Sequence, residues 1–559
     1  MAAKYEAIVV GAGLSGSWVA KELCDQGINT VMIDRGPNVV HLQDYPTASQ
    51  FPWDSEHRGR ISDKELEENP IASQCYNYYE GSKHFFTKDE EQEYVQEKPF
   101  SWIRGYQVGG KSLLWARQVQ RWSQHDFDGP VQDDFATPWP INYQDIAPWY
   151  DKVEDFIGVS GEYDGLETLP DGKFLRSIGM NVVEQHFKKT ISENYDDRHV
   201  IYGRCAHLTE VKDIHRQQGR GTCQHRVICE RGCPFGGYFS ANSSTIPWAK
   251  RTGNLTIQAD SIVSHIIYDE SQEKAIGVEI INRETRERSQ ILAEVIFMNA
   301  GTLNTNMVLM NSKSRRFPTG IGNDHQLLGK YMAFHNYRAR LVAETEAFKD
   351  RVIDGRSMTN AYMPRWKNIH SLNEDFKRGY AVAFYAYRTY IEETTSVGED
   401  LLKKMTKAKN FGPWQIDAMM MGETIPKFEN LVRLHPSLTD KYGIPQLVIN
   451  VDYDNNDQKM MEDFYQEMQE MFQKAGFSNI RKIDSGQAPG LDVHHMGGVR
   501  MGSDPTNSVV NKNSQIHTCK NIYVTDGSCM TSTGTQNPSL TFMALAARAA
   551  NHAVETYFK

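Results

Sequence analysis

Short apolar runs separated by glycine-rich turns mark the beginning of the chain. Residues 5–10 (YEAIVV) form an apolar run of the length of a buried strand, and the turn GAGLSG follows directly. Apolar positions then recur at helical spacing over residues 17–27, and residues 28–34 (INTVMID) form a second apolar run. This pattern predicts a strand–turn–helix–strand unit of the Rossmann type at the N-terminus.

Alternating segments in the second half of the chain predict a different kind of sheet. Apolar and polar residues alternate over residues 337–346 and again over residues 380–391. Such alternation is typical of antiparallel strands with one covered face. Apolar runs of the first kind return in residues 291–301 and 521–528, and a closing helix is predicted over residues 539–558.

The fold class that follows is α/β, with an α+β arrangement overall. Because strands of the nucleotide-binding type lie at both ends of the chain, the cofactor-binding domain is predicted to be discontinuous. We assign to it residues 1–40, 105–135, 200–330 and 490–559. The remaining chain is divided into a lid or insertion, residues 41–104, and an antiparallel-sheet substrate-binding domain, residues 136–199 and 331–489.

Composition and charge narrow the classes of partner. Of the 559 residues, 40% are hydrophobic and 24% are charged, which is usual for a soluble protein of more than one domain. The formal net charge of -10 argues against nucleic acid or an anionic membrane as a partner, because both attract basic surfaces. No apolar run approaches the roughly 20 residues that a membrane span needs.

The first glycine-rich turn has the spacing of a dinucleotide-binding motif. Gly11, Gly13 and Gly16 form G-x-G-x-x-G between the predicted strand and helix. In such a motif the glycines allow a tight turn, close approach of a pyrophosphate and close helix packing. Asp34 ends the next strand, where a carboxylate can bind a ribose. The motif predicts a dinucleotide site without distinguishing FAD from NAD.

Four further stretches distinguish the two cofactors. They are residues 105–122 (GYQVGGKSLLWARQVQRW), 138–154 (PWPINYQDIAPWYDKVE), 494–511 (HHMGGVRMGSDPTNSVVN) and 521–550 (NIYVTDGSCMTSTGTQNPSLTFMALAARAA). With the N-terminal motif, they resemble the glucose–methanol–choline oxidoreductase family, which depends on FAD. The resemblance is to the branch of bacterial glucoside 3-dehydrogenases, gluconate dehydrogenases and pyranose oxidases.

The resemblance implies a set of residues that contact the cofactor. Some relatives bond FAD covalently to a histidine at the position of Leu114, so the leucine here implies non-covalent FAD. The segment 301–312 departs from a family signature at Asn306. The implied FAD-binding residues are Gly11, Gly13, Gly16, Asp34, Arg35, Gly109, Gly110, Ser112, Trp115, Val263, Asp526, Gly527, Asn537 and Pro538.

The resemblance implies two residues that take part in the reaction. Oxidation of an alcohol needs a base for the hydroxyl proton and an acceptor for the hydride, here flavin N5, and histidine suits the first task. The family places a histidine six residues before the arginine of Arg-Met-Gly, and a histidine or asparagine before Pro-Ser-Leu. These positions are His494, the implied base, and Asn537, its partner. The adjacent His495 is left with a packing or supporting role.

Three cysteines form a separate cluster in the middle of the chain. Cys223, Cys229 and Cys233 have the spacing C-x5-C-x3-C and end in Cys-Pro. Three hypotheses are compatible with this spacing: free thiols, a zinc site with His207 or His225 as fourth ligand, and an iron–sulfur cluster. Some related sugar dehydrogenases carry a three-iron cluster on such a segment, so the resemblance favours the third.

The function implied is oxidation of a secondary hydroxyl of a sugar or glycoside, at C3, to a ketone. A gluconate-type or pyranose C2 dehydrogenase or oxidase is the alternative, and a non-catalytic flavin electron-transfer subunit is a second one. The expected partners are the sugar, an external acceptor of the cytochrome or quinone type, and a small subunit carrying an export signal. Because the first residues lack a signal-peptide pattern, we expect the bacterial cytoplasm, or the periplasm after export with such a subunit.

Overall fold

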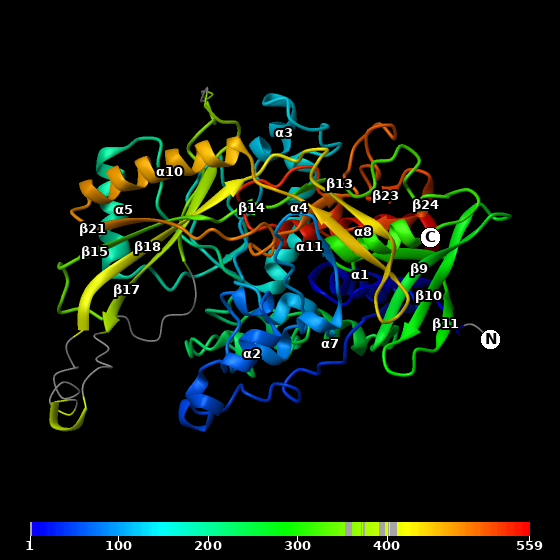
Figure 1. Cartoon of the computed structure of the whole chain (residues 1–559), viewed down its shortest axis with the longest axis horizontal. Helices are drawn as coiled ribbons and strands as arrows, with labels where there is room; N and C mark the ends of the chain where they lie inside the picture. Colours follow the sequence, from blue (N-terminus) through cyan, green and yellow to red (C-terminus); the bar gives the residue numbers. More distant parts are fainter. Residues whose placement is uncertain are drawn as a thin grey trace.

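Two sheets of different kinds organise the protein. The computed structural model describes residues 3–352, 360–370, 372, 375–390, 397–400, 402 and 411–559. The strands of a parallel sheet and of a large antiparallel sheet lie toward opposite ends of the long axis in Figure 1. The α/β fold class predicted from the apolar pattern is confirmed.

The parallel sheet draws its strands from both ends of the chain. Its order is β23-β24-β12-β2-β3-β8, and only the β23–β24 pair is antiparallel. The side chains of β2, β3 and β12 are buried throughout, so this sheet lies in the interior of the protein. The strands are β2 (Ala7–Val10), β3 (Thr30–Ile33), β8 (Leu255–Gln258), β12 (Val295–Met298), β23 (Gln515–Ile516) and β24 (Cys519–Val524).

Helices from distant parts of the chain pack around the first strand–turn–helix unit. Helix α1 (Leu14–Asp25) contacts both α7 (Thr245–Arg251) and α11 (Ser539–Ala553), and α11 also contacts α4 (Tyr143–Ile157). Helix α8 (Thr302–Asn311) follows β12. A four-stranded sheet lies beside them, in the order β1 (Ala3–Lys4), β11 (Arg288–Leu292), β10 (Lys274–Asn282) and β9 (Ser261–Asp269).

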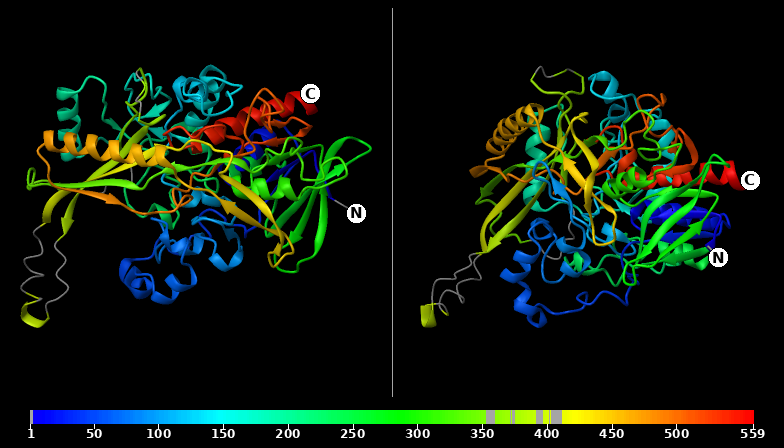
Figure 2. Two further views of the ribbon diagram at one scale, coloured as in Figure 1. Left: turned by 45° about the horizontal axis from the view of Figure 1, so that its top comes forward. Right: turned by 45° about the vertical axis from the view of Figure 1, so that its right-hand side comes forward.

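Helices cover one face of the antiparallel sheet, and part of the other face carries a smaller apolar cluster. Its order is β21-β15-β18-β17-β16-β7, with β14 also paired to β18. Helices α5 (Val182–Asn194) and α10 (Asn455–Lys474) cover one face with an apolar cluster. Figure 2 shows α10 lying along this face from two directions. The strands are β7 (Ile201–Tyr202), β14 (His335–Asn336), β15 (Ala339–Thr345), β16 (Ala361–Met363), β17 (Tyr380–Tyr390), β18 (Phe411–Glu423) and β21 (Ser478–Asp484).

Shorter elements connect the two sheets. Residues 41–104, predicted as a lid or insertion, hold short helical turns, and their role as a lid stays a prediction, as do the domain boundaries.

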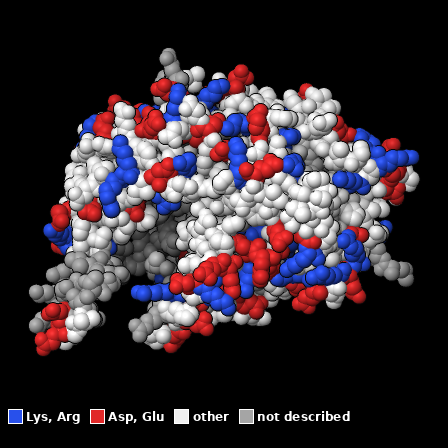
Figure 3. Space-filling model, viewed as in Figure 1, with Lys and Arg blue, Asp and Glu red and all other residues white. Residues whose placement is uncertain are grey.

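None of the helices described is long and apolar enough to cross a membrane. Acidic and basic groups are interspersed on the face shown in Figure 3. The remaining elements are α2 (Asp63–Glu68), α3 (Gln124–Gln132), α6 (Asp213–Gln217), β4 (Val95–Gln96), β5 (Val159–Ser160), β6 (Phe174–Leu175), β13 (Lys330–Ala333), β19 (Leu431–Thr439), β20 (Pro445–Asn450) and β22 (Met496–Gly498).

Candidate active site

A cavity of about 780 Å³ lies between the two sheets. It opens beyond the carboxyl ends of β2 and β3, where ligands of open α/β sheets bind, and it extends over the uncovered face of β17 and β18. Gly16 and Gly109 are absent from its lining. The predicted site residues that line it are Gly11, Gly13, Asp34, Arg35, Gly110, Ser112, Trp115, Val263, His494, Asp526, Gly527, Asn537 and Pro538.

The three glycines of the first turn have different surroundings. A Cβ on Gly11 would lie 2.2 Å from the Asn299 oxygen, and one on Gly16 would lie 1.9 Å from the Gly11 oxygen. A Cβ on Gly13 would meet no atom within 4 Å, because this residue faces the cavity. Gly11 and Gly16 are therefore required by the protein itself, whereas Gly13 leaves space for a ligand.

Asp34 supports the turn from the end of β3. Its two carboxylate oxygens accept the backbone N–H groups of Ala12 at 3.0 Å and Gly36 at 2.9 Å. Burial raises the pKa of Asp34 to about 6. The carboxylate thus fixes the turn and still lines the cavity, where its remaining lone pairs face a ligand.

Three helices begin at the cavity without a side-chain cap. The first residues of α1, α8 and α11 line the cavity, and their N-cap residues, Gly13, Gly301 and Pro538, provide no capping side-chain bond. The first N–H groups of a helix have no partner within it, and the helix dipole adds partial positive charge there. This end of the cavity is suited to an anionic ligand such as a pyrophosphate.

The second glycine-rich turn lies against the first. Gly109 has a left-handed backbone (φ 99°), and a Cβ there would lie 1.8 Å from the Asn242 side-chain oxygen. A Cβ on Gly110 would lie 3.1 Å from the Gly13 Cα atom. The Ser112 hydroxyl donates to the Gly109 oxygen at 2.6 Å and accepts the Ala241 N–H at 3.0 Å. Ser112 therefore holds the turn, which brings Gly110 to the cavity.

Asp526 connects the end of the last parallel strand to α8. Its carboxylate accepts the N–H of Gly301 at 2.9 Å, the hydroxyl of Thr305 at 2.5 Å and the N–H of Ser528 at 3.0 Å. Gly527 is needed beside it, because a Cβ there would lie 2.3 Å from the His495 oxygen. This arrangement brings the strand end and the histidine segment together.

His494 and Asn537, 43 positions apart in the chain, meet in the cavity. The Asn537 amide nitrogen lies 3.3 Å from His494 Nε2. The other ring nitrogen, Nδ1, lies 2.9 Å from His335 Nδ1 and 3.1 Å from the Tyr337 hydroxyl. The predicted pair is therefore in contact, and two residues that carry no sequence motif complete its surroundings.

The contacts of His335 determine which nitrogen of His494 carries the proton. His335 Nε2 lies 3.1 Å from the Gly534 carbonyl oxygen and 3.3 Å from that of Thr533, so it must donate. Burial lowers the pKa of His335 to about 4, so at neutral pH its Nδ1 is unprotonated and accepts. The 2.9 Å contact then requires a proton on His494 Nδ1. His494 Nε2 is therefore unprotonated, and its lone pair faces the Asn537 amide N–H group.

Burial keeps the neighbouring histidines neutral as well. It lowers the pKa of His494 well below its ordinary value, with nearby positive charge, including Lys111, adding to the effect. It also lowers the pKa of His495 to about 3. His495 Nε2 lies 3.2 Å from the Gly490 oxygen, and its ring packs against those of Phe100 and Phe334. The structure thus places His495 in a packed position away from Asn537.

Two more groups that sequence reasoning missed support the histidine segment. The Asp492 carboxylate accepts the backbone N–H groups of His335 at 2.9 Å and His494 at 3.3 Å, and burial raises its pKa to about 6. The Lys111 ammonium donates to the Val493 oxygen at 3.2 Å. Lys111 lies in a glycine-rich stretch and Asp492 lies two residues before His494, but neither position has a signal that separates it from ordinary loop polarity.

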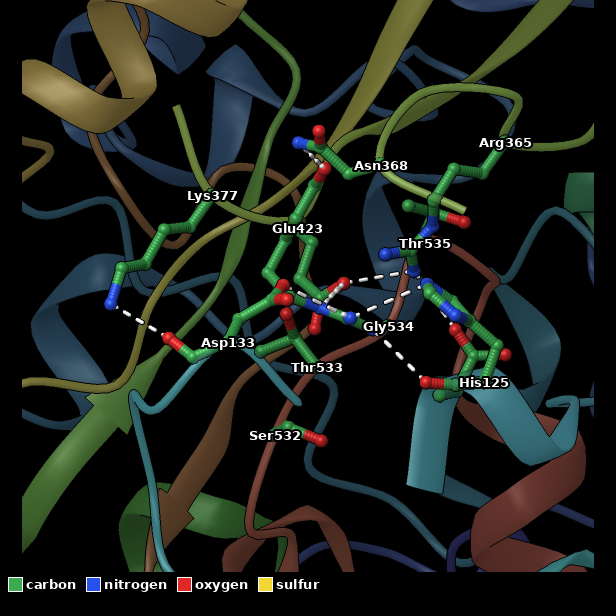
Figure 4. A network of polar contacts seen from close by, with 12 residues as sticks. His125, Asp133, Arg365, Asn368, Lys377, Glu423, Ser532, Thr533, Gly534 and Thr535 are labelled. Carbon is green, nitrogen blue, oxygen red and sulfur yellow. Dashed lines mark hydrogen bonds and ion pairs between the residues drawn. The ribbon is translucent and has the colours of Figure 1, made fainter. Parts of the chain in front are cut away.

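A buried ionic network holds the loop that carries Asn537. Arg365 forms ion pairs with Asp126 at 2.9 Å and Glu423 at 2.8 Å, and Arg378 binds Glu423 at 3.0 Å. The Gln536 amide donates to Asp126 at 2.9 Å. Figure 4 shows the loop of residues 532–535 beside this network. The network therefore links the loop that carries Asn537 to the end of β18, where Glu423 lies, and to Arg378, just before β17.

The structure gives no support to the metal centre predicted for the cysteine segment. Among the residues that the structure describes, no group of three or more His, Cys, Asp and Glu side chains is arranged to hold a metal ion. The Cys229 sulfur lies 3.9 Å from His207 Nε2, whereas the Cys233 sulfur accepts the Gly237 N–H at 3.4 Å. Cys223, Cys229 and Cys233 are free thiols, so neither the iron–sulfur nor the zinc hypothesis is supported.

Known proteins share both the sequence pattern and the fold. 2-Methyl-1,2-propanediol dehydrogenase from Mycolicibacterium austroafricanum is 24% identical over 98% of this chain and 94% of that protein. The fructose dehydrogenase large subunit from Gluconobacter japonicus is 21% identical over 98% of this chain and 97% of that protein. The solved structure of pyridoxine 4-oxidase from Mesorbium loti has a TM-score of 0.61 at 15% identity, and covers 99% of this chain and 100% of that one.

Two family models match most of the chain. Both describe GMC oxidoreductases, and they match residues 5–336 and residues 426–546. The first alone covers more than half of the chain. The resemblance read from the sequence is confirmed. The chain therefore belongs to the GMC oxidoreductases, a family of FAD-dependent enzymes that act on alcohols and sugars.

Proposed function

We propose that the protein oxidises a secondary hydroxyl group of a sugar or glycoside, at C3, to a ketone, with FAD bound non-covalently. One observation carries the proposal: His494 Nε2 is unprotonated in the cavity and lies 3.3 Å from the Asn537 amide nitrogen. A neutral base beside a hydrogen-bond donor is the pair of groups that alcohol oxidation requires.

The residues of the site handle the hydroxyl proton. The substrate hydroxyl donates to His494 Nε2 while the Asn537 amide donates to the hydroxyl oxygen. The buried Asn537 side-chain oxygen has no hydrogen-bond partner among the described residues, so it can accept from a second hydroxyl of the substrate. As His494 takes the proton, its Nδ1–H stays bonded to His335 Nδ1, which stabilises the charged ring.

The cofactor end of the cavity has the features that FAD needs. Gly13 leaves space beside the uncapped start of α1, where a pyrophosphate would bind, and Asp34 lies where a ribose would. Leu114, buried at the cavity wall, has no atom that could bond covalently to a flavin. Bound FAD supplies the acceptor for the hydride that leaves the oxidised carbon.

The substrate class rests on the kind of relatives and on the polar wall of the cavity. The names of two relatives, fructose dehydrogenase large subunit and gluconate 2-dehydrogenase flavoprotein, specify a sugar and a sugar acid. Gln118, Arg340 and Asn360 line the substrate end of the cavity and can bind hydroxyl groups. A dehydrogenase of this kind passes its electrons to an external cytochrome or quinone, and a small subunit with an export signal would take it to the periplasm.

Anaerobic substrate profiling tests the proposed function. The FAD-loaded enzyme is given an artificial acceptor and a panel of glucosides, gluconate and simple alcohols, and each product is identified by NMR. A 3-keto glycoside is the expected product. A 2-keto product would correct the position of oxidation, and the absence of reduction by any sugar would contradict the proposal.

A further inference from the structure

Two stacked tyrosines lie on the uncovered face of β17, in the same cavity as His494. The rings of Tyr385 and Tyr387 are 5.5 Å apart with an angle of 22° between them. Both residues line the cavity, and Tyr385 is 45% exposed. Their neighbours on the other face of the strand, Phe384 and Ala386, belong to the apolar cluster under α5 and α10. The two tyrosines are therefore not needed to fill the protein core.

A carboxylate fixes both tyrosines from the neighbouring strand. Asp417 of β18 lies opposite Tyr385 in the register of the sheet. One oxygen of its carboxylate accepts both hydroxyl groups, Tyr385 at 3.4 Å and Tyr387 at 3.3 Å, and the other oxygen accepts the Gln415 amide at 2.8 Å. The bonds hold the ring faces in place, and the half-exposed carboxylate keeps an acceptor position for a ligand.

An arginine faces the same region from β15. Arg340 lies opposite Met419 in the register and lines the cavity. Its guanidinium forms no ion pair with any of the residues that the structure describes, although it lies close enough to influence the Tyr385 hydroxyl. An aromatic platform, an acceptor and an unpaired donor group are thus gathered at one place. Such a combination can bind a ring that carries a hydroxyl group.

The strands also set the distance from this cluster to the site of oxidation. Along the cavity face of β18, Met421 and Met419 come before Asp417, and Ala383 of β17 lies opposite Met419. These apolar positions pack in one cluster with Tyr337, which contacts His494. Successive residues on one face of a strand are about 7 Å apart. Tyr385 and Asp417 therefore lie about one sugar unit farther along the strands from the Tyr337 end of the cavity than Ala383 and Met419 do.

We propose that Tyr385, Tyr387, Asp417 and Arg340 form a second subsite, which binds the ring of an aglycone while the sugar is oxidised at His494. This inference rests on the proposed function and adds the class of substrate: a glycoside whose aglycone is a ring with a hydroxyl group, either a second sugar or a phenol. The aglycone ring stacks on Tyr385, and its hydroxyl group donates to Asp417.

The test compares four substrates on the FAD-loaded enzyme. They are methyl β-glucoside, phenyl β-glucoside, 4-hydroxyphenyl β-glucoside and cellobiose. For Tyr385→Ala, the ratio of kcat/KM for each ring-bearing substrate to that for methyl β-glucoside falls about tenfold, from the loss of stacking. Tyr385→Phe keeps the ratio for phenyl β-glucoside. Asp417→Asn lowers the ratio only for 4-hydroxyphenyl β-glucoside and cellobiose, the two substrates whose aglycone carries a hydroxyl group. Tyr163→Ala, a change at an exposed tyrosine outside the cavity, is the control.

The pattern of losses among the four substrates decides the inference. Equal losses for all four substrates would overturn it, because they would mean a general structural defect, and so would unchanged ratios in Tyr385→Ala. A loss confined to cellobiose or to the phenol glucoside would identify the kind of aglycone. If the wild-type enzyme oxidises none of the four, the proposed function fails, and calorimetric titration with 4-hydroxyphenyl β-glucoside still measures whether Tyr385→Ala weakens binding.

Discussion

The two ends of the cavity are built in different ways. At the cofactor end, backbone atoms and glycines shape the wall, and a Cβ on Gly11, Gly16 or Gly109 would overlap a neighbour at 2.2 Å or less. At the substrate end, side chains on the open face of β17 and β18 form the wall, and the backbone beneath them is ordinary sheet. Changes at the first end should therefore alter folding or cofactor binding, and changes at the second should alter rate or specificity.

The buried ionic network supports the loop that carries Asn537. We expect Arg365→Met to lower the free energy of unfolding by about 3–5 kcal/mol, because it leaves Asp126 buried without its ion-pair partner. Denaturant unfolding of the apoprotein measures the change. Arg338→Met, which removes a partly exposed ion pair to Asp484, is the matched control and should cost no more than about 1 kcal/mol. Equal losses in the two variants would contradict this reading.

The adjacent histidines give the largest contrast in rate. His494→Ala should slow flavin reduction by sugar at least about 10²-fold, because it removes the base. His495→Ala should slow it by no more than about threefold, since its ring packs against Phe100 and Phe334 and its loss removes packing, not the base. Anaerobic stopped-flow absorbance measures both. Near-normal reduction in His494→Ala would show that the base is another group.

The glycines of the first turn separate cofactor binding from folding. Gly13→Ala should weaken FAD binding roughly tenfold, the effect of about 1–3 kcal/mol of overpacking against the cofactor. The apoprotein should stay as stable as the wild type, because the backbone of Gly13 (φ -74°, ψ -160°) suits any residue. Gly16→Ala should instead destabilise the apoprotein, since its Cβ would lie 1.9 Å from the Gly11 oxygen. Fluorescence titration with FAD and thermal unfolding distinguish the two effects, and the reverse pattern would refute the assignment.

His335 should have a smaller effect on rate than His494. His335→Leu removes the acceptor that keeps the proton on His494 Nδ1, and we expect flavin reduction to slow by about three- to tenfold, the value of one neutral hydrogen bond. His335→Asn retains an acceptor oxygen on the same side and should recover part of the rate. If the two variants behave alike, the contact is structural and does not select the tautomer.

Sequence reasoning located the cofactor end well and the substrate end only in outline. The glycines are visible because a backbone requirement restricts the residue type at each position, and the spacing to Arg500 separated His494 from His495. Tyr337 begins an alternating segment and His335 lies two residues before it. Either residue could be ordinary sheet, so their contact with a residue 157 to 159 positions away could not be inferred. The spacing of Cys223, Cys229 and Cys233 favoured a metal centre, and the described residues give that hypothesis no support.

The pH dependence of flavin reduction tests most directly whether His494 is a neutral base. Burial lowers the pKa of His494, and a base acts only when unprotonated, so the rate should be retained as the pH falls and should decline only well below pH 6.5, the ordinary histidine value. The rate constant is measured with methyl β-glucoside under anaerobic conditions, across the pH range in which the protein stays folded. We expect this acid limb in the wild type and its loss in His494→Ala. An acid limb at or above pH 6.5, or one that remains in His494→Ala, would contradict it.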